Sequence, residues 1–140
     1  DLSRAMSTAT VMVHQAIAEK AGLTATDHNY VDILFQHGDM TAGKLAEHTG
    51  LTTGAVTGVI DRLEKEGLVE RARDPKDRRK VLVVLKKEAA LRRIGPAFEE
   101  MQGSLDNLYA GFSLDELHTI ERYLKATIDF YQRQIEALKA

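Results

Sequence analysis

The segment Thr41–Leu85, TAGKLAEHTGLTTGAVTGVIDRLEKEGLVERARDPKDRRKVLVVL, decides the fold. Its first part predicts two short helices joined by a tight turn around Gly50, since a left-handed backbone costs glycine nothing. The first helix covers residues 41–48, and the second runs to about Glu66, where Gly67 ends it. The hydroxyl of Thr52 or of Thr53 can cap the start of the second helix.

Apolar residues at fixed distances from Gly50 are typical of two helices that cross closely. A small residue precedes the glycine by four positions, and branched aliphatic residues lie around it. We expect these side chains to fill the wedge between the two helices: Leu45, Ala46, Leu51, Val56 and Val59.

Two strands follow, over residues 69–73 and 80–85, and the second is an unbroken aliphatic run. Between them, Asp74-Pro75-Lys76-Asp77 has turn chemistry, because proline fixes φ and aspartate bonds its own backbone. Two helices and a turn followed by a hairpin predict a winged helix-turn-helix, which places one helix in the major groove of DNA.

Helices are also expected on both sides of this unit. Apolar spacing predicts one over residues 2–21, a second from Thr24, and a long one from Lys86 to about Ala110 with a bend at Gly95-Pro96. Ser113 and Glu116 form a capping box that starts the last helix. Its apolar stripe has nearly the spacing of a coiled-coil seam: Leu117, Ile120, Leu124, Ile128, Tyr131, Ile135 and Leu138. We interpret the first and last helices as a subunit interface, and an intramolecular core helix is the alternative.

Charge is unevenly distributed, although the net charge of the 140 residues is only −2. Residues 62–93 contain 12 Lys/Arg and 6 Asp/Glu, so the basic surplus surrounds the expected wing. This distribution favours a polyanionic partner at the wing, and a solvated charged loop is the alternative. Several basic residues are assigned to phosphate contacts or to solvation: Lys65, Arg71, Arg73, Lys76, Arg78 and Lys80.

Composition excludes several classes of protein. The chain has no cysteine, and therefore no disulfide, thiolate metal site or thiol switch. It has no apolar run long enough to cross a bilayer and no signal-peptide pattern, so a cytoplasmic protein is expected. His28 and Asp32 lie one helical turn apart, but one such pair falls short of a zinc site. We expect no metal, no cofactor and no enzymatic activity, because no nucleophile elbow or phosphate-binding glycine loop is present.

The second helix of the unit has short residues at its outward positions. Gly54 and Gly58 each cost about 1 kcal/mol of helix propensity relative to alanine. Close approach to DNA would offset this cost, and close helix packing is the alternative. The residues expected to bind DNA from this helix and from the wing are Thr52, Thr53, Gly54, Thr57, Gly58, Arg62, Arg73, Lys76, Asp77, Arg78 and Arg79. Asp61 also faces outward.

From Leu45 to Leu85, the sequence LAEHTGLTTGAVTGVIDRLEKEGLVERARDPKDRRKVLVVL resembles the winged helix of the bacterial multiple-antibiotic-resistance regulator (MarR) family. The order of the flanking helices matches as well. In that family the wing carries Asp-x-Arg, matched here by Asp77 and Arg79, so the resemblance implies that Arg79 enters the minor groove and that Asp77 orients it. Two departures are Gly58, where a larger polar residue is common, and residues 86–89, which replace the usual Thr and Gly.

The resemblance also implies an effector pocket where the DNA-binding part meets the dimer helices. The candidate lining residues are Met12, His14, Tyr30, Phe35, Phe98, Met101 and Leu105. Residues of these types are more often plain core residues than ligand contacts, and that is the alternative for each.

The expected fold is mainly α: a winged helix-turn-helix over residues 25–87 plus N- and C-terminal dimerisation helices over residues 1–24 and 88–140, in a single domain overall. The expected function is that of a homodimeric, sequence-specific transcriptional repressor. It would bind a near-palindromic operator in double-stranded DNA and be relieved by a small molecule, without contact with a membrane. A winged helix used for protein–protein docking, without DNA, is the alternative.

Overall fold

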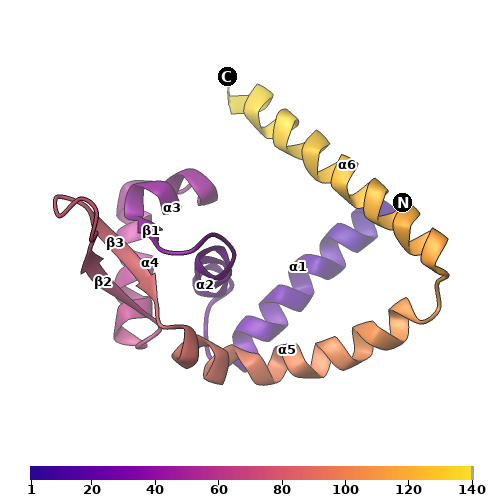
Figure 1. The fold of residues 1–140 in the computed structure, drawn as a ribbon, viewed down its shortest axis with the longest axis horizontal. Coiled ribbons are helices and arrows are strands. Elements are labelled where there is room, and N and C mark those ends of the chain that lie inside the picture. The colour runs from indigo at the N-terminus through magenta and orange to yellow at the C-terminus, as the bar shows by residue number, and fades with distance from the viewer. Residues whose placement is uncertain (140) are drawn as a thin grey trace. The chain divides into compact units, whose positions relative to one another are not determined.

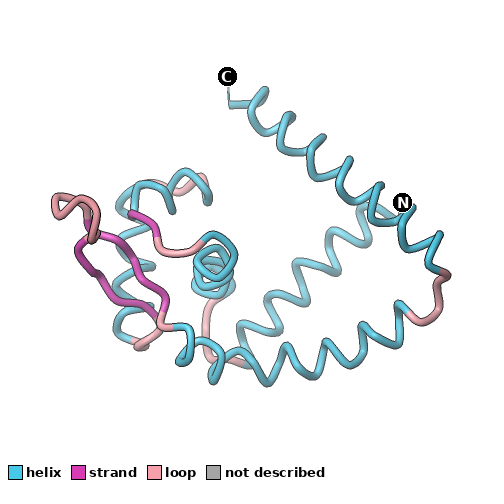
Figure 2. The backbone as a smooth tube through the Cα atoms, viewed as in Figure 1, coloured by secondary structure: helices cyan, strands magenta, loops and turns pink. Residues whose placement is uncertain are grey.

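A computed structural model describes residues 1–139, apart from the side chain of Glu100. The chain is mainly helical with one small sheet, as the sequence predicts (Figures 1 and 2). The elements are, in chain order, α1 (Leu2–Lys20), α2 (Ala25–His37), β1 (Met40–Thr41), α3 (Ala42–Thr49), α4 (Thr53–Lys65), β2 (Val69–Arg73), β3 (Val81–Leu85), α5 (Lys87–Tyr109) and α6 (Leu114–Lys139). Within the described residues, no helix combines the length and the apolar character that crossing a membrane requires.

The chain divides into two compact units, Asp1–Glu99 and the part that begins at Glu100. The first unit holds the core, formed by apolar side chains of α2, α3, α4 and the sheet. The largest fully buried side chains are Tyr30, Val31, Leu34, Leu45, Val56, Ile60, Leu63, Leu68, Val69 and Val83. The α4 residues expected to face inward are therefore buried.

The helix-turn-helix has the local chemistry that the sequence predicts. Gly50 has φ of +68° and closes α3, and its N–H donates to the carbonyl of Ala46. The Thr52 hydroxyl accepts from the N–H of Ala55 and so caps α4. Leu51 differs from the expectation: it is 40% exposed and lies on the outside of the turn, because the wedge is already filled by Leu45 and the α4 side chains.

The sheet has three strands in the order β1-β3-β2, one more than the sequence predicts. The register pairs Val69 with Leu85 and Arg73 with Val81, and β1 adds two residues to the other edge of β3. This third strand escapes prediction because two residues carry no alternating pattern. Asp39 supports the same edge, since its carboxylate accepts from the N–H of Leu85.

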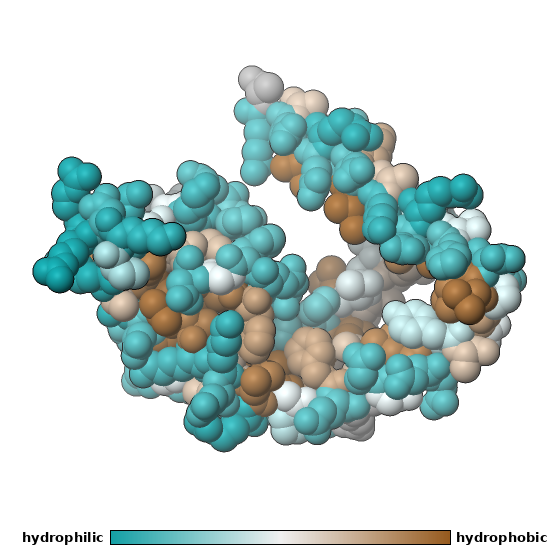
Figure 3. All heavy atoms as spheres, viewed as in Figure 1, coloured by the Kyte–Doolittle hydropathy of each residue, from teal (hydrophilic) through white to brown (hydrophobic). Residues whose placement is uncertain are grey.

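The second unit contains the end of α5 and all of α6. The capping box is present: the Ser113 hydroxyl accepts from the Glu116 N–H, and the Glu116 carboxylate accepts from the Ser113 N–H at 2.8 Å. Within α6, which is described to Lys139, no residue is buried. Leu117 is partly buried, and the other six residues of the expected stripe are exposed, from 37% at Ile120 to 86% at Leu138. Figure 3 shows hydrophobic side chains along one edge of this helix.

Candidate nucleic-acid interface

The loop between β2 and β3 is a turn held by hydrogen bonds. The Lys76 N–H donates to the Asp74 carboxylate at 2.8 Å, an Asx-turn, and the Asp74 N–H donates to the carbonyl of Lys80. The Arg73 guanidinium donates to the carbonyl of Arg78 across the loop. Figure 3 shows hydrophilic side chains gathered over this hairpin tip. The tip therefore holds its basic residues on a defined backbone.

Arg79 is the most exposed cation of the wing whose orientation is fixed. Its side chain is 91% exposed, yet its Nε donates to Asp77 Oδ1 at 3.1 Å and its backbone N–H donates to the same oxygen. These hydrogen bonds lower the pKa of the Asp77 carboxyl, so Asp77 stays ionised well into the acid range. The orienting contact that the resemblance implies for this pair is present.

Arg78 and Lys76 differ from Arg79. Both are exposed, and no ion pair among the described residues engages either side chain. Their positive charge is therefore not neutralised by a carboxylate of the described residues, and a phosphate contact from either side chain stays a prediction.

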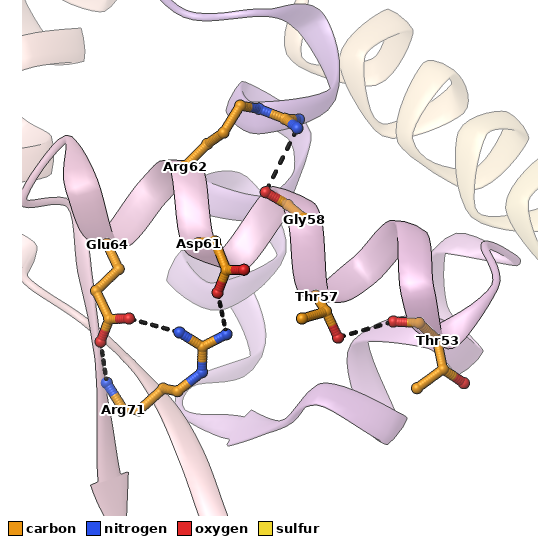
Figure 4. Close-up of polar contacts among 7 residues, drawn as sticks. All are labelled: Thr53, Thr57, Gly58, Asp61, Arg62, Glu64 and Arg71. Carbon is orange, nitrogen blue, oxygen red and sulfur yellow. Dashed lines mark hydrogen bonds and ion pairs between the residues drawn. The ribbon is translucent and has the colours of Figure 1, made fainter.

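The outer face of α4 carries Thr53, Thr57, Gly58 and Asp61 (Figure 4), and the exposed Gly54 follows Thr53. A Cβ built on Gly54 would meet no atom within 4 Å, and one on Gly58 would meet only the Arg62 guanidinium at 4.0 Å. Close helix packing within this chain therefore does not require either glycine, and it does not explain why α4 tolerates the low helix propensity of the two glycines. The explanation that remains is close approach of an external partner.

Arg62 has a partner that sequence reasoning missed. Its Nη2 lies 2.8 Å from Asp27 Oδ1, and its Nε lies 3.2 Å from the same atom. The Asp27 side chain is only 7% exposed, whereas that of Arg62 is 52% exposed. The contact joins α4 to α2 between residues that are 35 positions apart in the sequence. At that separation, residue spacing cannot predict which side chains meet. The same hydrogen bonds raise the pKa of Arg62.

Arg71 forms ion pairs that hold α4 against β2. From β2, its guanidinium binds the carboxylates of Asp61 and Glu64, and its N–H donates to Glu64 at 3.1 Å (Figure 4). Further pairs link Lys86 to Glu70 and Arg93 to Glu66. Of the six basic residues that the sequence assigns to phosphates or solvation, Arg71 is thus paired with carboxylates within the protein, whereas Lys76 and Arg78 at the hairpin tip have no ion pair among the described residues.

A cavity of about 200 Å³ lies in the first unit between α2 and α5. Its lining residues are His28, Val31, Asp32, Phe35, Ala90, Leu91, Ile94, Gly95 and Phe98. Of the seven residues proposed for an effector, only Phe35 and Phe98 line it.

The other candidates lie elsewhere. His14 does not line the cavity, but its ring centroid lies 5.8 Å from that of His28, which does. Tyr30 is a core residue with its hydroxyl 3.2 Å from the Thr49 hydroxyl, and Met12 is 64% exposed. Met101 and Leu105 belong to the second unit.

His28 is the polar residue at the wall of this cavity. It is 3% exposed and stacks on Phe98 with the ring centroids 6.0 Å apart. Burial, followed by the charge of His14, lowers its pKa, while Asp32 opposes the shift. His28 is therefore held mainly neutral near pH 7. The other histidine contact is an exposed stack of His37 on His48, and within residues 1–139 no group of three potential ligands is placed to hold a metal ion.

Comparison with known proteins agrees with this architecture. Residues 23–81 match the model of the MarR family. Over 138 residues the chain is 41% identical to an uncharacterized HTH-type transcriptional regulator of Bacillus subtilis, YcgE, and the match covers 99% of this chain and 89% of that protein.

The chain belongs to the MarR family. A MarR family protein from Bacillus stearothermophilus superposes with a TM-score of 0.78 at 27% identity, covering 94% of this chain and 91% of its own. The apo form of wild-type MarR from E. coli shares the fold, with a TM-score of 0.67 over 90% of this chain and 93% of its own, at 24% identity. Members of the family are DNA-binding transcriptional regulators, so this chain is a regulator with a winged helix for DNA.

The Asp27–Arg62 contact predicts a stability effect. Replacing Arg62 with methionine leaves a buried carboxylate without its partner, which we expect to reduce the free energy of unfolding by about 1–3 kcal/mol. Urea denaturation at fixed protein concentration measures it. The matched control is Arg78→Met, which removes an exposed, unpaired guanidinium and should change stability by less than about 0.5 kcal/mol. Equal effects of the two variants would contradict a supporting role for the contact.

Proposed function

We propose that this MarR family regulator is a homodimeric repressor that covers a near-palindromic operator, acts in the cytoplasm, and is released from DNA by a small molecule. Two adjoining features support DNA binding. The outer face of α4 has no long side chains, and the wing that follows it in sequence presents an oriented, exposed arginine. Both lie in the first unit.

The proposed DNA contacts divide into two groups. From α4 and its cap come Thr52, Thr53, Gly54, Thr57 and Gly58. Short residues there let the N-terminus of the helix approach phosphates and base edges, helped by the helix dipole. From the wing come Arg73, Lys76, Asp77, Arg78 and Arg79. Arg79 is proposed to enter the minor groove, where a narrow groove concentrates negative potential, with Asp77 orienting it.

Arg62 receives a revised role in this proposal. The sequence predicts that Arg62 contacts DNA, but its guanidinium is engaged by Asp27. We propose that it positions α4 on α2, and that its exposed edge is left for at most a phosphate.

A gel shift of the full chain against its own upstream DNA tests the proposal. We expect a discrete complex whose affinity falls steeply between about 50 and 200 mM salt, because phosphate contacts release counterions. No shift with any upstream duplex would instead favour a docking module without DNA.

The dimer is proposed from α1 and α6. The regions assigned to it are residues 1–24 and 88–140, around a winged helix of residues 25–87. The α6 stripe is apolar and exposed in a single chain, and an apolar face of this length favours burial against another subunit. Dimerisation would give two α4 helices a spacing of about 34 Å, one turn of DNA.

The effector is proposed to bind the cavity between α2 and α5. Its walls are apolar except for His28 and Asp32. A volume of about 200 Å³ suits a small, mainly apolar molecule with one hydrogen-bonding group. Ligand bound there would contact α2 one residue from Asp27, and through Asp27 it could influence Arg62 and α4.

Arg79→Ala should weaken operator binding by about 1–3 kcal/mol, the scale of one specific contact, because the oriented guanidinium is lost. Fluorescence anisotropy at fixed salt measures the change. Arg122→Ala removes the same charge from α6 and should leave affinity nearly unchanged. An unchanged affinity for Arg79→Ala would remove Arg79 from the DNA-reading residues.

Ile128→Glu should convert the dimer into a monomer of 15.6 kDa, because it places a charge in the middle of the α6 stripe. Sedimentation equilibrium at micromolar concentration measures the mass. Ala126→Glu introduces the same charge on the opposite face of α6 and should leave the dimer intact. A monomeric wild-type chain under these conditions would contradict the dimer.

Leu91→Trp should abolish the response to an effector without weakening DNA binding. Leu91 lines the cavity yet is 56% exposed, so a larger side chain can enter the cavity mouth without disturbing the core. The test screens small aromatic acids and phenols for release of the wild-type chain from DNA, then repeats the active one on the variant. A variant released as readily as the wild type would show that the effector binds elsewhere.

A further inference from the structure

The outer face of α4 is poor in free hydrogen-bonding groups. From Thr53 to Ile60 the sequence is TGAVTGVI, which contains no Asn, Gln, Arg, Lys, His, Asp or Glu. The usual bidentate pairs, arginine with guanine and asparagine or glutamine with adenine, are therefore impossible from these two turns.

Most polar groups that the helix does carry are already engaged within the protein. The Thr57 hydroxyl donates to the carbonyl of Thr53 at 3.0 Å (Figure 4). The Thr52 hydroxyl accepts from the N–H of Ala55. At the far end, Asp61 binds Arg71 and Arg62 binds Asp27. The Thr53 hydroxyl is the exception, since no hydrogen bond within the described residues engages it.

What the face offers to a partner is apolar and shallow. The methyl groups of Thr53, Ala55 and Thr57 lie on exposed residues, and Thr57 is fixed by its own hydroxyl bond. Beside them, a Cβ on Gly54 would project into open space, and one on Gly58 would meet only the Arg62 guanidinium at 4.0 Å, an ordinary van der Waals contact. A helix without those two side chains can lie closer to the floor of the major groove, which brings the threonine methyls within van der Waals contact of base edges.

Thymine is the base that presents a methyl group in the major groove. We propose that α4 reads thymines by methyl-to-methyl contact, with Thr57 as the central specificity-determining residue and Gly54 and Gly58 giving it access. This inference rests on the proposed DNA-binding function and adds the base class and the chemistry of recognition. It predicts an operator in which thymines occupy the major-groove positions of both half-sites.

The test removes one methyl at a time from the DNA. The full chain is bound to the highest-affinity duplex selected from a randomised library, and each thymine is replaced singly with deoxyuridine, which lacks only the 5-methyl group. We expect affinity to fall about three- to fivefold at the thymines under α4, the scale of one buried methyl. Replacement of purines in the same half-site with their 7-deaza analogues, which lack the N7 acceptor, should change affinity less than twofold.

Two variants assign the effect to Thr57. Thr57→Ser keeps the hydroxyl and its bond to Thr53 but lacks the methyl, so it should bind the thymine operator three- to fivefold more weakly and lose sensitivity to deoxyuridine at the facing position. Thr57→Val keeps the methyl and should keep that sensitivity. Thr119→Ser is the control, because Thr119 is an exposed threonine of α6 with the same bond to the carbonyl four residues earlier.

The outcomes separate this inference from the function on which it rests. Failure to select any duplex overturns the DNA-binding function itself. Tight binding that no deoxyuridine weakens, or that the 7-deaza purines weaken more, overturns methyl recognition alone. An equal loss with deoxyuridine in wild type and Thr57→Ser assigns the effect to DNA stiffness and overturns the role of Thr57.

Discussion

The position of α4 is the constraint on which the rest of the structure depends. Its inner face is buried through Val56, Val59, Ile60 and Leu63, and its C-terminal half is held from two sides by ion pairs. Arg62 binds Asp27 of α2, and Arg71 of β2 binds Asp61 and Glu64. The half-exposed guanidinium of Arg62 stabilises the fold chiefly because, without it, the buried carboxylate of Asp27 would be a desolvated charge with no partner. These ion pairs leave the same groups little capacity for base contacts, so the residues that hold α4 in place differ from those proposed to read DNA.

This division explains why the wing and α4 differ in character. The wing presents charge, with Arg79 oriented by Asp77 and Arg78 left free. The helix presents glycine and threonine. Charge near a groove supplies affinity and sensitivity to DNA shape, whereas methyl contacts discriminate bases with little electrostatic gain. In the proposed complex with DNA, the two surfaces would therefore contribute different parts of recognition.

Local chemistry could be predicted from the sequence because it depends on neighbours in the chain. The Gly50 turn, the Ser113–Glu116 capping box and the two long strands follow from spacing, which also limits the cap of α4 to Thr52 or Thr53, and the structure selects Thr52. Contacts between distant segments could not: the Asp27–Arg62 pair, the short strand β1, and the cavity in which His28 stacks on Phe98 depend on how the helices pack. Leu51 shows the same limit, since its apolar character indicates burial while the filled wedge leaves it on the outside. For the candidate site, the sequence predicts the outer face of α4 and the wing as the DNA-binding surfaces, but it could not show which of their charges are already paired.

A hydroxyl-radical footprint of the full chain on its operator tests the central account most directly, because it reports minor-groove and backbone contacts nucleotide by nucleotide. Two wings and two α4 helices predict a symmetrical pattern, with protected minor-groove segments outside two major-groove centres about 34 Å apart. A single protected segment, or protection confined to the major-groove centres with open minor grooves, would contradict the joint use of helix and wing.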